Sequence, residues 1–309
     1  MPAPLSEVMT VLGPVAPHQL GITLPHEHLW LNFHRVRGNP DGILNDVELA
    51  IREVNCFKQA GGASLVELTC LGLDRNPAAL RRVAEATGLN IIMGSGWYRE
   101  QYYPADMNRR STNDLADQIV RDVSTGVDDT GVRAGIIGEI GCLDFISGIE
   151  ERVFRAAARA HHQTGATIST HAAWYPTGIP QLDILAEEGV SPERVVIGHC
   201  DFYPDPDYHV AIAERGAWVQ FDRNGGRTPF EWERRVTWIR NLVDRGHLGR
   251  LLLSHDVCLQ SDLQAYGGTG YDFILTRLVP MLLQAGMSQA QIDQVLIENP
   301  RRALTGADA

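Results

Sequence analysis

Short runs of apolar and β-branched residues recur along the chain, and polar segments with helical spacing separate them. Each run is almost continuously apolar, which is typical of parallel strands that are covered on both faces. We therefore expect eight strands, which end within the ranges 20–28, 64–70, 90–96, 134–141, 166–171, 194–200, 217–222 and 250–256.

The segments between these runs carry helix signals. The range 45–62 has Asn45 or Asp46 as a cap and glycines at its end, and 228–247 opens with Thr-Pro and closes at Gly246. Two further helices are expected over 148–165 and 287–304, the last stopped by Asn299-Pro300. Strands that alternate with helices in this way predict an α/β fold, the (β/α)8 TIM barrel.

The opening segment "EVMTVLGPVAPHQLG" predicts a short N-terminal β-hairpin that closes the bottom of the barrel. No linker, low-complexity segment or block of like charge divides the rest of the chain. Barrels of this kind routinely reach 309 residues as one unit, so we expect a single barrel domain over 1–309.

Composition and charge exclude several classes of partner. The 27 basic and 38 acidic residues give a net charge of -11, without a basic stripe, which argues against nucleic acid or an anionic membrane surface. No apolar run approaches the roughly 18 residues of a membrane span. The five cysteines are scattered and the N-terminus lacks signal-peptide features, so we expect a reduced, cytoplasmic protein.

Histidines and acidic residues, whose side chains commonly bind metal ions, lie at the ends of five predicted strands, where the active site of such a barrel lies. In "LPHEHLWLNFH" the two histidines of the first strand occupy alternate positions, so they share one side and Glu27 faces away. The strand-end residues are His26, His28, Glu139, His171, His199 and Asp256.

Each of these side chains alone has an ordinary structural explanation, as a hydrogen-bonded histidine or a helix cap. Six of them at one level of the barrel favour a metal centre instead. Imidazole and carboxylate ligands suit Zn²⁺, which we expect, with Mn²⁺, Co²⁺ or Fe²⁺ as alternatives.

The motifs "TLPHEHL", "GEIG", "THAAW", "IGHCD" and "LLLSHDVC" resemble those of the phosphotriesterase-related family of the amidohydrolase superfamily, from about residue 8 to residue 304. The resemblance implies that His26, His28 and Asp256 hold one divalent ion and that His171 and His199 hold a second. It also implies a bridging hydroxide and a bridging protein ligand. Many members use a carboxylated lysine as that bridge, whereas this sequence resembles a subset with a glutamate, here Glu139.

The expected reaction is attack of the bridging hydroxide on the carbonyl of a lactone or carboxylic ester, with Asp256 as the catalytic proton acceptor. Hydrolysis of an N-acyl amide is an alternative, as is weak, promiscuous phosphotriesterase activity. A non-catalytic metal-binding protein is the remaining alternative. Asp256 argues against it, because a purely structural site needs no proton acceptor.

Aromatic residues and one arginine are expected to form the wall of a pocket for a small-molecule substrate. Trp97 and Tyr98 follow the third predicted strand, and Trp174 and Tyr175 follow the fifth. Arg223 follows the seventh, and Tyr98 and Arg223 resemble pocket residues of the family's lactonases. The resemblance also leaves open a homodimer, which related barrels commonly form.

Overall fold

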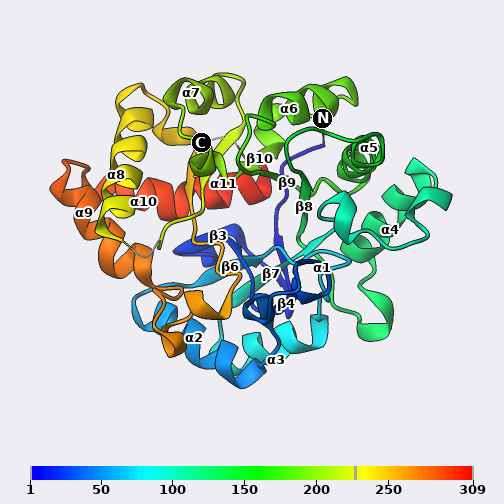
Figure 1. Cartoon of the computed structure of the whole chain (residues 1–309), viewed down its shortest axis with the longest axis horizontal. Coiled ribbons are helices and arrows are strands. Elements are labelled where there is room, and N and C mark those ends of the chain that lie inside the picture. Colours follow the sequence, from blue (N-terminus) through cyan, green and yellow to red (C-terminus); the bar gives the residue numbers. More distant parts are fainter. Residues whose placement is uncertain (1, 226–227, 308–309) are drawn as a thin grey trace.

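The eight predicted strands form one parallel sheet, in which their order follows the chain. The structure, a computed structural model, describes residues 2–225 and 228–307. Figure 1 shows the strands at the centre with helices around them, so the (β/α)8 barrel is confirmed. The barrel strands are β3 Thr23–Glu27, β6 Ser64–Glu67, β7 Asn90–Ser95, β8 Ile136–Cys142, β9 Ile168–Ala172, β10 Val195–Gly198, β11 Trp218–Phe221 and β12 Leu251–Leu253.

The first and last strands meet at a seam that is joined partly by side chains. The hydroxyl of Ser254 donates to the carbonyl oxygen of His26 (2.7 Å) and accepts from the backbone N–H of His26 (3.0 Å). The backbone N–H of Asp256 also donates to the His26 carbonyl oxygen, at 3.2 Å. The seam therefore holds the two ends of the sheet together at the level of the candidate ligands.

Glu27 strengthens this seam from the side opposite the two histidines, as the alternation along β3 predicts. Its Oε1 lies 2.7 Å from the Ser254 hydroxyl oxygen and accepts from the backbone N–H of His255 (2.8 Å). Its Oε2 accepts from the backbone N–H of Val257, at 3.1 Å. Glu27 is completely buried, so its role is to fix the loop after β12 rather than to meet a substrate.

Seven of the ten helices given below begin at side-chain caps, whereas α6, α9 and α11 do not. Asp46 Oδ1 accepts from the Leu49 N–H, which selects Asp46 over Asn45 as the cap of α2, and Ser147 and Glu150 form a reciprocal capping box on α5. The helices are α2 Val47–Gln59, α3 Pro77–Thr87, α4 Thr112–Ser124, α5 Gly148–Thr164, α6 Gly178–Glu187, α7 Pro206–Glu214, α8 Pro229–Asp244, α9 Val279–Gln284, α10 Gln289–Asp293 and α11 Asn299–Thr305.

The prediction that Asn299-Pro300 stops the last helix is wrong. A π-helical turn, η12 Gln294–Glu298, joins α10 to α11, and Pro300 lies in the first turn of α11. The helical path therefore continues through Pro300, which has no N–H to donate, and the hydrogen-bond spacing changes from α to π in the turn directly before it. The helix ends instead at Gly306, whose φ of 68° is the left-handed conformation that favours glycine.

The predicted N-terminal hairpin is present, formed by β1 Val8–Thr10 and β2 Gly13–Val15. The backbone N–H of Val11 donates to the Ile91 carbonyl oxygen at 2.9 Å, and Val8 packs with Ile92 and Ile136. These partners lie near the beginnings of β7 and β8, so the hairpin closes the end of the barrel opposite the candidate ligands.

Short elements occupy the connections. They are β4 Leu31–Asn32, β5 Ile43–Leu44, α1 His34–Arg37, η1 Pro17–Gln19, η2 Pro40–Gly42, η3 Glu100–Tyr102, η4 Met107–Arg109, η5 Asp128–Thr130, η6 Pro192–Arg194, η7 Cys200–Phe202, η8 Leu248–Arg250, η9 Gln260–Asp262, η10 Gln264–Tyr266 and η11 Ile274–Leu278. In the described part of the chain, no helix combines the length and apolarity that crossing a membrane requires.

Candidate metal centre

Five strands bring the six predicted ligands to one end of the barrel. His26 lies in β3 and His28 directly follows that strand, whereas Glu139 and His171 lie within β8 and β9. His199 directly follows β10, and Asp256 lies three residues beyond β12. All six side chains belong to buried residues, with exposed fractions of 7% or less. The sequence therefore located a buried cluster of imidazoles and carboxylates.

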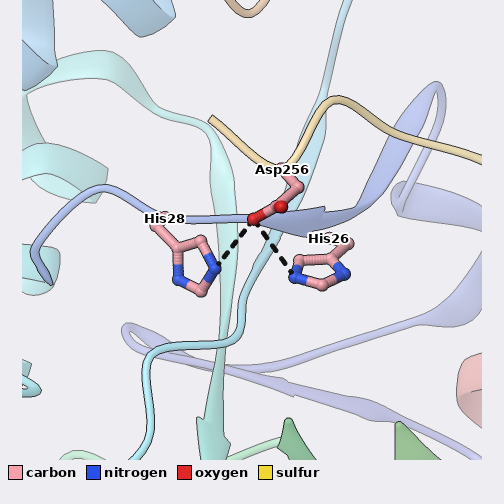
Figure 2. Close-up of side chains that lie close together, drawn as sticks. All are labelled: His26, His28 and Asp256. Atoms are coloured by element: carbon pink, nitrogen blue, oxygen red, sulfur yellow. Dashed lines mark ion pairs between the residues drawn. The ribbon is translucent and has the colours of Figure 1, made fainter. Parts of the chain in front are cut away.

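His26, His28 and Asp256 form the first candidate group, with one ligand atom of each within 4.8 Å of the others. Figure 2 shows an oxygen of Asp256 between the two imidazoles. This Oδ1 lies 3.2 Å from His28 Nε2 and 3.6 Å from His26 Nε2. The arrangement presents two nitrogens and one oxygen to a common point.

Glu139, His171 and His199 form the second candidate group. Glu139 Oε1 lies 3.8 Å from His171 Nε2 and 3.5 Å from His199 Nε2. The other oxygen, Oε2, lies 3.0 Å from His26 Nε2 and 3.9 Å from His28 Nε2. Glu139 thus directs one carboxylate oxygen to each group, as a ligand that bridges two cations must.

Asp222 orients one histidine of each group. Its Oδ2 lies 2.9 Å from His26 Nδ1, and its Oδ1 lies 2.7 Å from His199 Nδ1. Gln220 donates to Asp222 Oδ2 at 2.8 Å and holds this fully buried carboxylate in place. Because each Nδ1 is engaged, the Nε2 of each ring faces the centre, which is the usual arrangement of ligand histidines.

The other two histidines are held in the same way. His28 Nδ1 lies 2.9 Å from the Thr69 hydroxyl, which donates in turn to buried Glu67 at 2.6 Å. His171 Nδ1 lies 3.2 Å from the Cys142 carbonyl oxygen. All four imidazoles therefore direct Nε2 inward and receive support at Nδ1 from the protein.

Two buried atoms at the centre test whether these residues fit metal ions. Among the described residues, His26 Nε2 and Glu139 Oε1 have no hydrogen-bond partner, although the former lies only 3.0 Å from Glu139 Oε2. Buried polar atoms without partners are costly unless something else compensates them. Cations between the two groups would compensate both atoms, so the donor set fits two divalent ions that share Glu139.

The carboxylates of the centre are held in their ionised forms. Burial opposes the charge of Glu139, but the neighbouring His26 outweighs this and holds the pKa of Glu139 well below its usual range. Burial likewise raises the pKa of Asp256, but a hydrogen bond from His28 and the charge of Arg223 lower that pKa to about 2. Both groups are therefore available as anionic ligands at neutral pH.

The pKa values of the imidazoles are shifted in opposite directions, downward for His171 and upward for His199 and His26. Burial, aided by the charge of His199, lowers the pKa of His171 to about 3, so its imidazole is neutral. Burial also disfavours charge on His199, but Asp222 outweighs it and raises the pKa of His199 to about 10. His26, between Glu139 and Asp222, has a pKa raised well above its usual value against the effect of burial.

Loading the metal-free protein with zinc at pH 7 is expected to release about two protons per chain from His26 and His199, since ligand imidazoles must be neutral, in addition to the proton of any metal-bound water that ionises. A weakly buffered zinc titration with a pH indicator measures this release, with zinc added to buffer alone as the blank. Release of less than one proton would contradict the assignment.

In the metal-free protein, the stabilisation from the raised pKa of His199 is complete below about pH 6.5 and is lost as the pH rises through about 10.

A cavity of about 190 Å³ opens above the candidate ligands. Its lining combines part of the metal centre with aromatic rings and three arginines. The lining residues are His28, Phe33, Arg37, Tyr98, Arg99, Glu139, His171, Ala173, Trp174, His199, Phe202, Arg223, Asp256, Cys258 and Leu259.

Two predicted aromatic wall residues line this cavity. The Tyr98 hydroxyl lies 2.8 Å from His171 Nε2, and its ring is almost completely buried. Trp174 is 59% exposed and packs on Phe202 with ring centroids 4.2 Å apart, at the mouth of the cavity. Tyr98 therefore contacts the centre itself, whereas Trp174 borders its entrance.

The structure places Trp97 and Tyr175 outside the lining of this cavity. Trp97 is 1% exposed, pairs with Leu71 across neighbouring loops, and has the Arg110 guanidinium 5.0 Å above its ring. Tyr175 follows Trp174 but is directed toward solvent and is 45% exposed. The sequence showed that aromatic residues follow these strands, but it did not show which of them face inward.

Arg223 lines the cavity as predicted, but its guanidinium is bound to the protein. Its Nη1 donates to the carbonyl oxygen of Asp256 (2.8 Å) and to Asp256 Oδ2 (3.0 Å). Arg223 therefore positions the carboxylate whose other oxygen faces the histidines.

Sequence reasoning missed Arg37 and Arg99 as cavity residues. Arg99 directly follows Tyr98 in "GSGWYREQYYP", so its proximity to a predicted wall residue was a usable signal. Arg37 belongs to α1 in the connection after β3, and no motif marked it.

The barrel and its candidate centre define a metal-dependent hydrolase class, and comparison of the sequence specifies the family. The chain belongs to the phosphotriesterase family, whose model matches residues 6–304. The family is typically binuclear and metal-dependent, in agreement with the two candidate ligand groups.

Individual relatives share most of the chain. It is 39% identical to the phosphotriesterase homology protein of Escherichia coli K12 over 91% of this chain and 96% of that protein. The crystal structure of the E. coli protein, complexed with phosphate in its active site, has a TM-score of 0.90 and covers 93% of this chain and 99% of that one. An N-acetyltaurine hydrolase of Dictyostelium discoideum is 33% identical over 92% of this chain and 80% of that protein. The crystal structure of a lactonase from Listeria monocytogenes has a TM-score of 0.89 at 26% identity and covers 98% of this chain and all of that one.

Proposed function

We propose that this hydrolase cleaves the amide bond of a small N-acyl compound at a centre that holds two divalent ions. The observation that carries the proposal is the division of Glu139, with one oxygen directed to each candidate ligand group. The similarity to N-acetyltaurine hydrolases, at 32–33% identity over most of this chain, supports an amide as the substrate class.

The proposed ligands are His26, His28 and Asp256 for one ion and His171 and His199 for the other, with Glu139 shared. Glu139 then stands where many family members carry a carboxylated lysine. Imidazole and carboxylate donors favour Zn²⁺ among the candidate metals. Such ions, when bound, lower the pKa of a water molecule and polarise a carbonyl group.

Asp256 is the proposed proton carrier. Its Oδ1 faces the histidines, and its Oδ2 and backbone oxygen are held by Arg223, so the carboxylate is fixed beside the position of an attacking water. The carboxylate would accept a proton at Oδ1 and pass it to the leaving amine. Tyr98, whose hydroxyl lies at His171, is the proposed substrate-positioning group on the other side of the centre.

Lactone or carboxylic ester hydrolysis is the second candidate, as the sequence motifs first indicated. The fold similarity to the Listeria lactonase favours it, although the identity is lower than that to the amide hydrolases. Both reactions begin with attack on a carbonyl carbon, so the same side chains serve either. Phosphotriester hydrolysis is at most a weak side activity.

A substrate screen on protein of known metal content tests this proposal. The zinc-loaded protein should contain about two ions per chain and should hydrolyse N-acyl compounds faster than lactones, aryl esters or phosphotriesters. Zero or one ion in an active sample would refute the binuclear centre. Faster hydrolysis of lactones would instead select the second candidate.

A further inference from the structure

Arg99 is a buried cation for which the described part of the protein supplies aromatic contacts but no acidic partner. The residue is 7% exposed, its Nε has no hydrogen-bond partner, and no described carboxylate forms an ion pair with it. A buried charge of this kind is costly unless it is paired. Arg99 nevertheless lines the cavity above the candidate ligands, so an anion that enters the cavity can reach it.

Three acids lie beside Arg99 in the fold, and in the described part of the chain none of them forms an ion pair with it. Glu100, Asp144 and Glu150 line a separate cavity of about 250 Å³ that Arg99 also borders. Glu150 accepts from the backbone N–H groups of Glu100 (3.1 Å) and Ser147 (3.0 Å) through its two oxygens. This carboxylate therefore caps backbone groups and leaves the Arg99 charge uncompensated.

An aromatic cluster connects Arg99 both to the candidate centre and to a second arginine. The Arg99 guanidinium lies 4.7 Å from the centroid of the Tyr98 ring, and that ring lies 4.8 Å from the His171 ring. Arg37 Nε donates to the Tyr102 hydroxyl at 2.9 Å, and the Tyr102 ring lies 5.2 Å from that of Tyr98. Arg37 is exposed, has no described acidic partner and lines the same cavity.

The carboxylates that line the cavity have partners, whereas two of its arginines have no acidic partner among the described residues. Its two lining carboxylates, Glu139 and Asp256, are both committed to the candidate ligand groups, and Asp256 also pairs with Arg223. Arg37 and Arg99 therefore remain as uncompensated cations in a protein whose overall charge is -11. A guanidinium presents donors in a planar fork that matches a carboxylate or sulfonate.

We propose that Arg99, assisted by Arg37 at the mouth, binds an anionic group of the substrate while the bond to be cleaved lies at the candidate metal centre. The proposal rests on the proposed hydrolase function and adds the substrate class: a small acyl compound whose leaving part carries a carboxylate or sulfonate. The Tyr98 ring contacts both the Arg99 guanidinium and the His171 ring, so the proposed anion site is close to the centre and a short linker separates the anion from the acyl group.

Three substrates with the same acetyl group and two-carbon linker test this proposal. They are N-acetyltaurine, N-acetyl-β-alanine and the neutral N-acetylethanolamine, and together they separate a sulfonate, a carboxylate and an uncharged group. The zinc-loaded protein is expected to prefer one or both anions over the neutral compound. Arg99→Gln should lower kcat/KM for the preferred anion about 10–100-fold, mainly through KM, and should lower kcat/KM for the neutral compound much less.

Matched variants separate recognition from loss of structure. Arg99→Lys should recover part of the preference, and Arg37→Gln, at an exposed position, should cause a smaller loss without unfolding the protein. Arg82→Gln removes an arginine that is exposed and paired with Glu48, and it should change nothing. Melting temperature and zinc content are measured for every variant. Equal hydrolysis of all three substrates, or equal losses on all three in Arg99→Gln, would overturn the proposal.

Binding of ethanesulfonate and propionate, measured by calorimetry, keeps the test independent of turnover. If none of the acetyl compounds is cleaved, the amide assignment fails, but tighter anion binding by the zinc-loaded wild type than by Arg99→Gln would still support the anion site. Identical binding of both anions by the two proteins would overturn it.

Discussion

Asp256→Asn is expected to lower kcat by about 10²–10⁴-fold while the protein keeps its fold and, at saturating zinc, its two ions. The amide retains an oxygen that can face His28 and His26, but it cannot accept a proton. The pKa of Asp256, lowered to about 2 by His28 and Arg223 against the effect of burial, keeps the wild-type carboxylate ionised across the neutral range. Single-turnover rates and metal analysis on one preparation measure the two properties separately.

Asp183→Asn provides the matched control, because Asp183 is exposed and, among the residues that the structure describes, forms its ion pair with Arg215 at the surface. It should retain wild-type kcat. Wild-type turnover in Asp256→Asn would show that another group carries the proton. A loss of zinc that saturating metal cannot restore would show instead that Asp256 acts mainly as a ligand.

Glu139→Gln is expected to reduce the zinc content from about two ions per chain to one or fewer and to abolish most activity. Glu139 Oε2 lies 3.0 Å from His26 Nε2, and Oε1 lies 3.5 Å from His199 Nε2. The substitution removes the one charge that both candidate groups share. We expect the affinity for the more weakly held ion to fall by more than the roughly 10–100-fold that loss of an outer hydrogen-bonding partner costs.

Zinc titration with competing chelator measures these affinities, and Glu187→Gln, at an exposed glutamate paired with Arg155, is the control. Two ions bound with wild-type affinity in Glu139→Gln would exclude a bridging role.

A glutamate also needs no carbon dioxide to become a ligand. Reconstitution of the metal-free protein should therefore proceed equally with and without added bicarbonate, and a strict bicarbonate requirement would contradict the glutamate bridge.

The barrel and the cluster of candidate ligands were predictable because both depend on periodic patterns. Buried strands are marked by apolar runs, and His26 and His28 lie on one side of β3 because alternate residues do so in any strand. The parallel arrangement then places residues at or near the ends of other strands, such as Glu139 and His171, at the same level. These relations need no knowledge of side-chain conformation.

The cavity wall depends on loops, whose conformations follow no such period. Trp97 and Tyr98 are adjacent in sequence, but only the latter lines the cavity, because the backbone after β7 turns the Trp97 ring toward Arg110. Arg99 could have been suspected from its neighbour, but its missing ion pair is visible only when every surrounding group has been placed. Arg37 reaches the cavity through a connection after β3 that carries no recognisable motif.

The seam between β3 and β12 has a further consequence for how the barrel opens. Ser254 and His26, which are 228 positions apart, bond directly across it, and the first candidate ligand group spans the same boundary. An ion held by His26, His28 and Asp256 would be a non-covalent cross-link between the beginning and the end of the chain. The binding free energy of this ion would add to the free energy of the contacts that close the barrel between β3 and β12. If these two strands separated, their residues could no longer bind the same ion. Release of that ion and opening of the barrel at this boundary would then be thermodynamically linked.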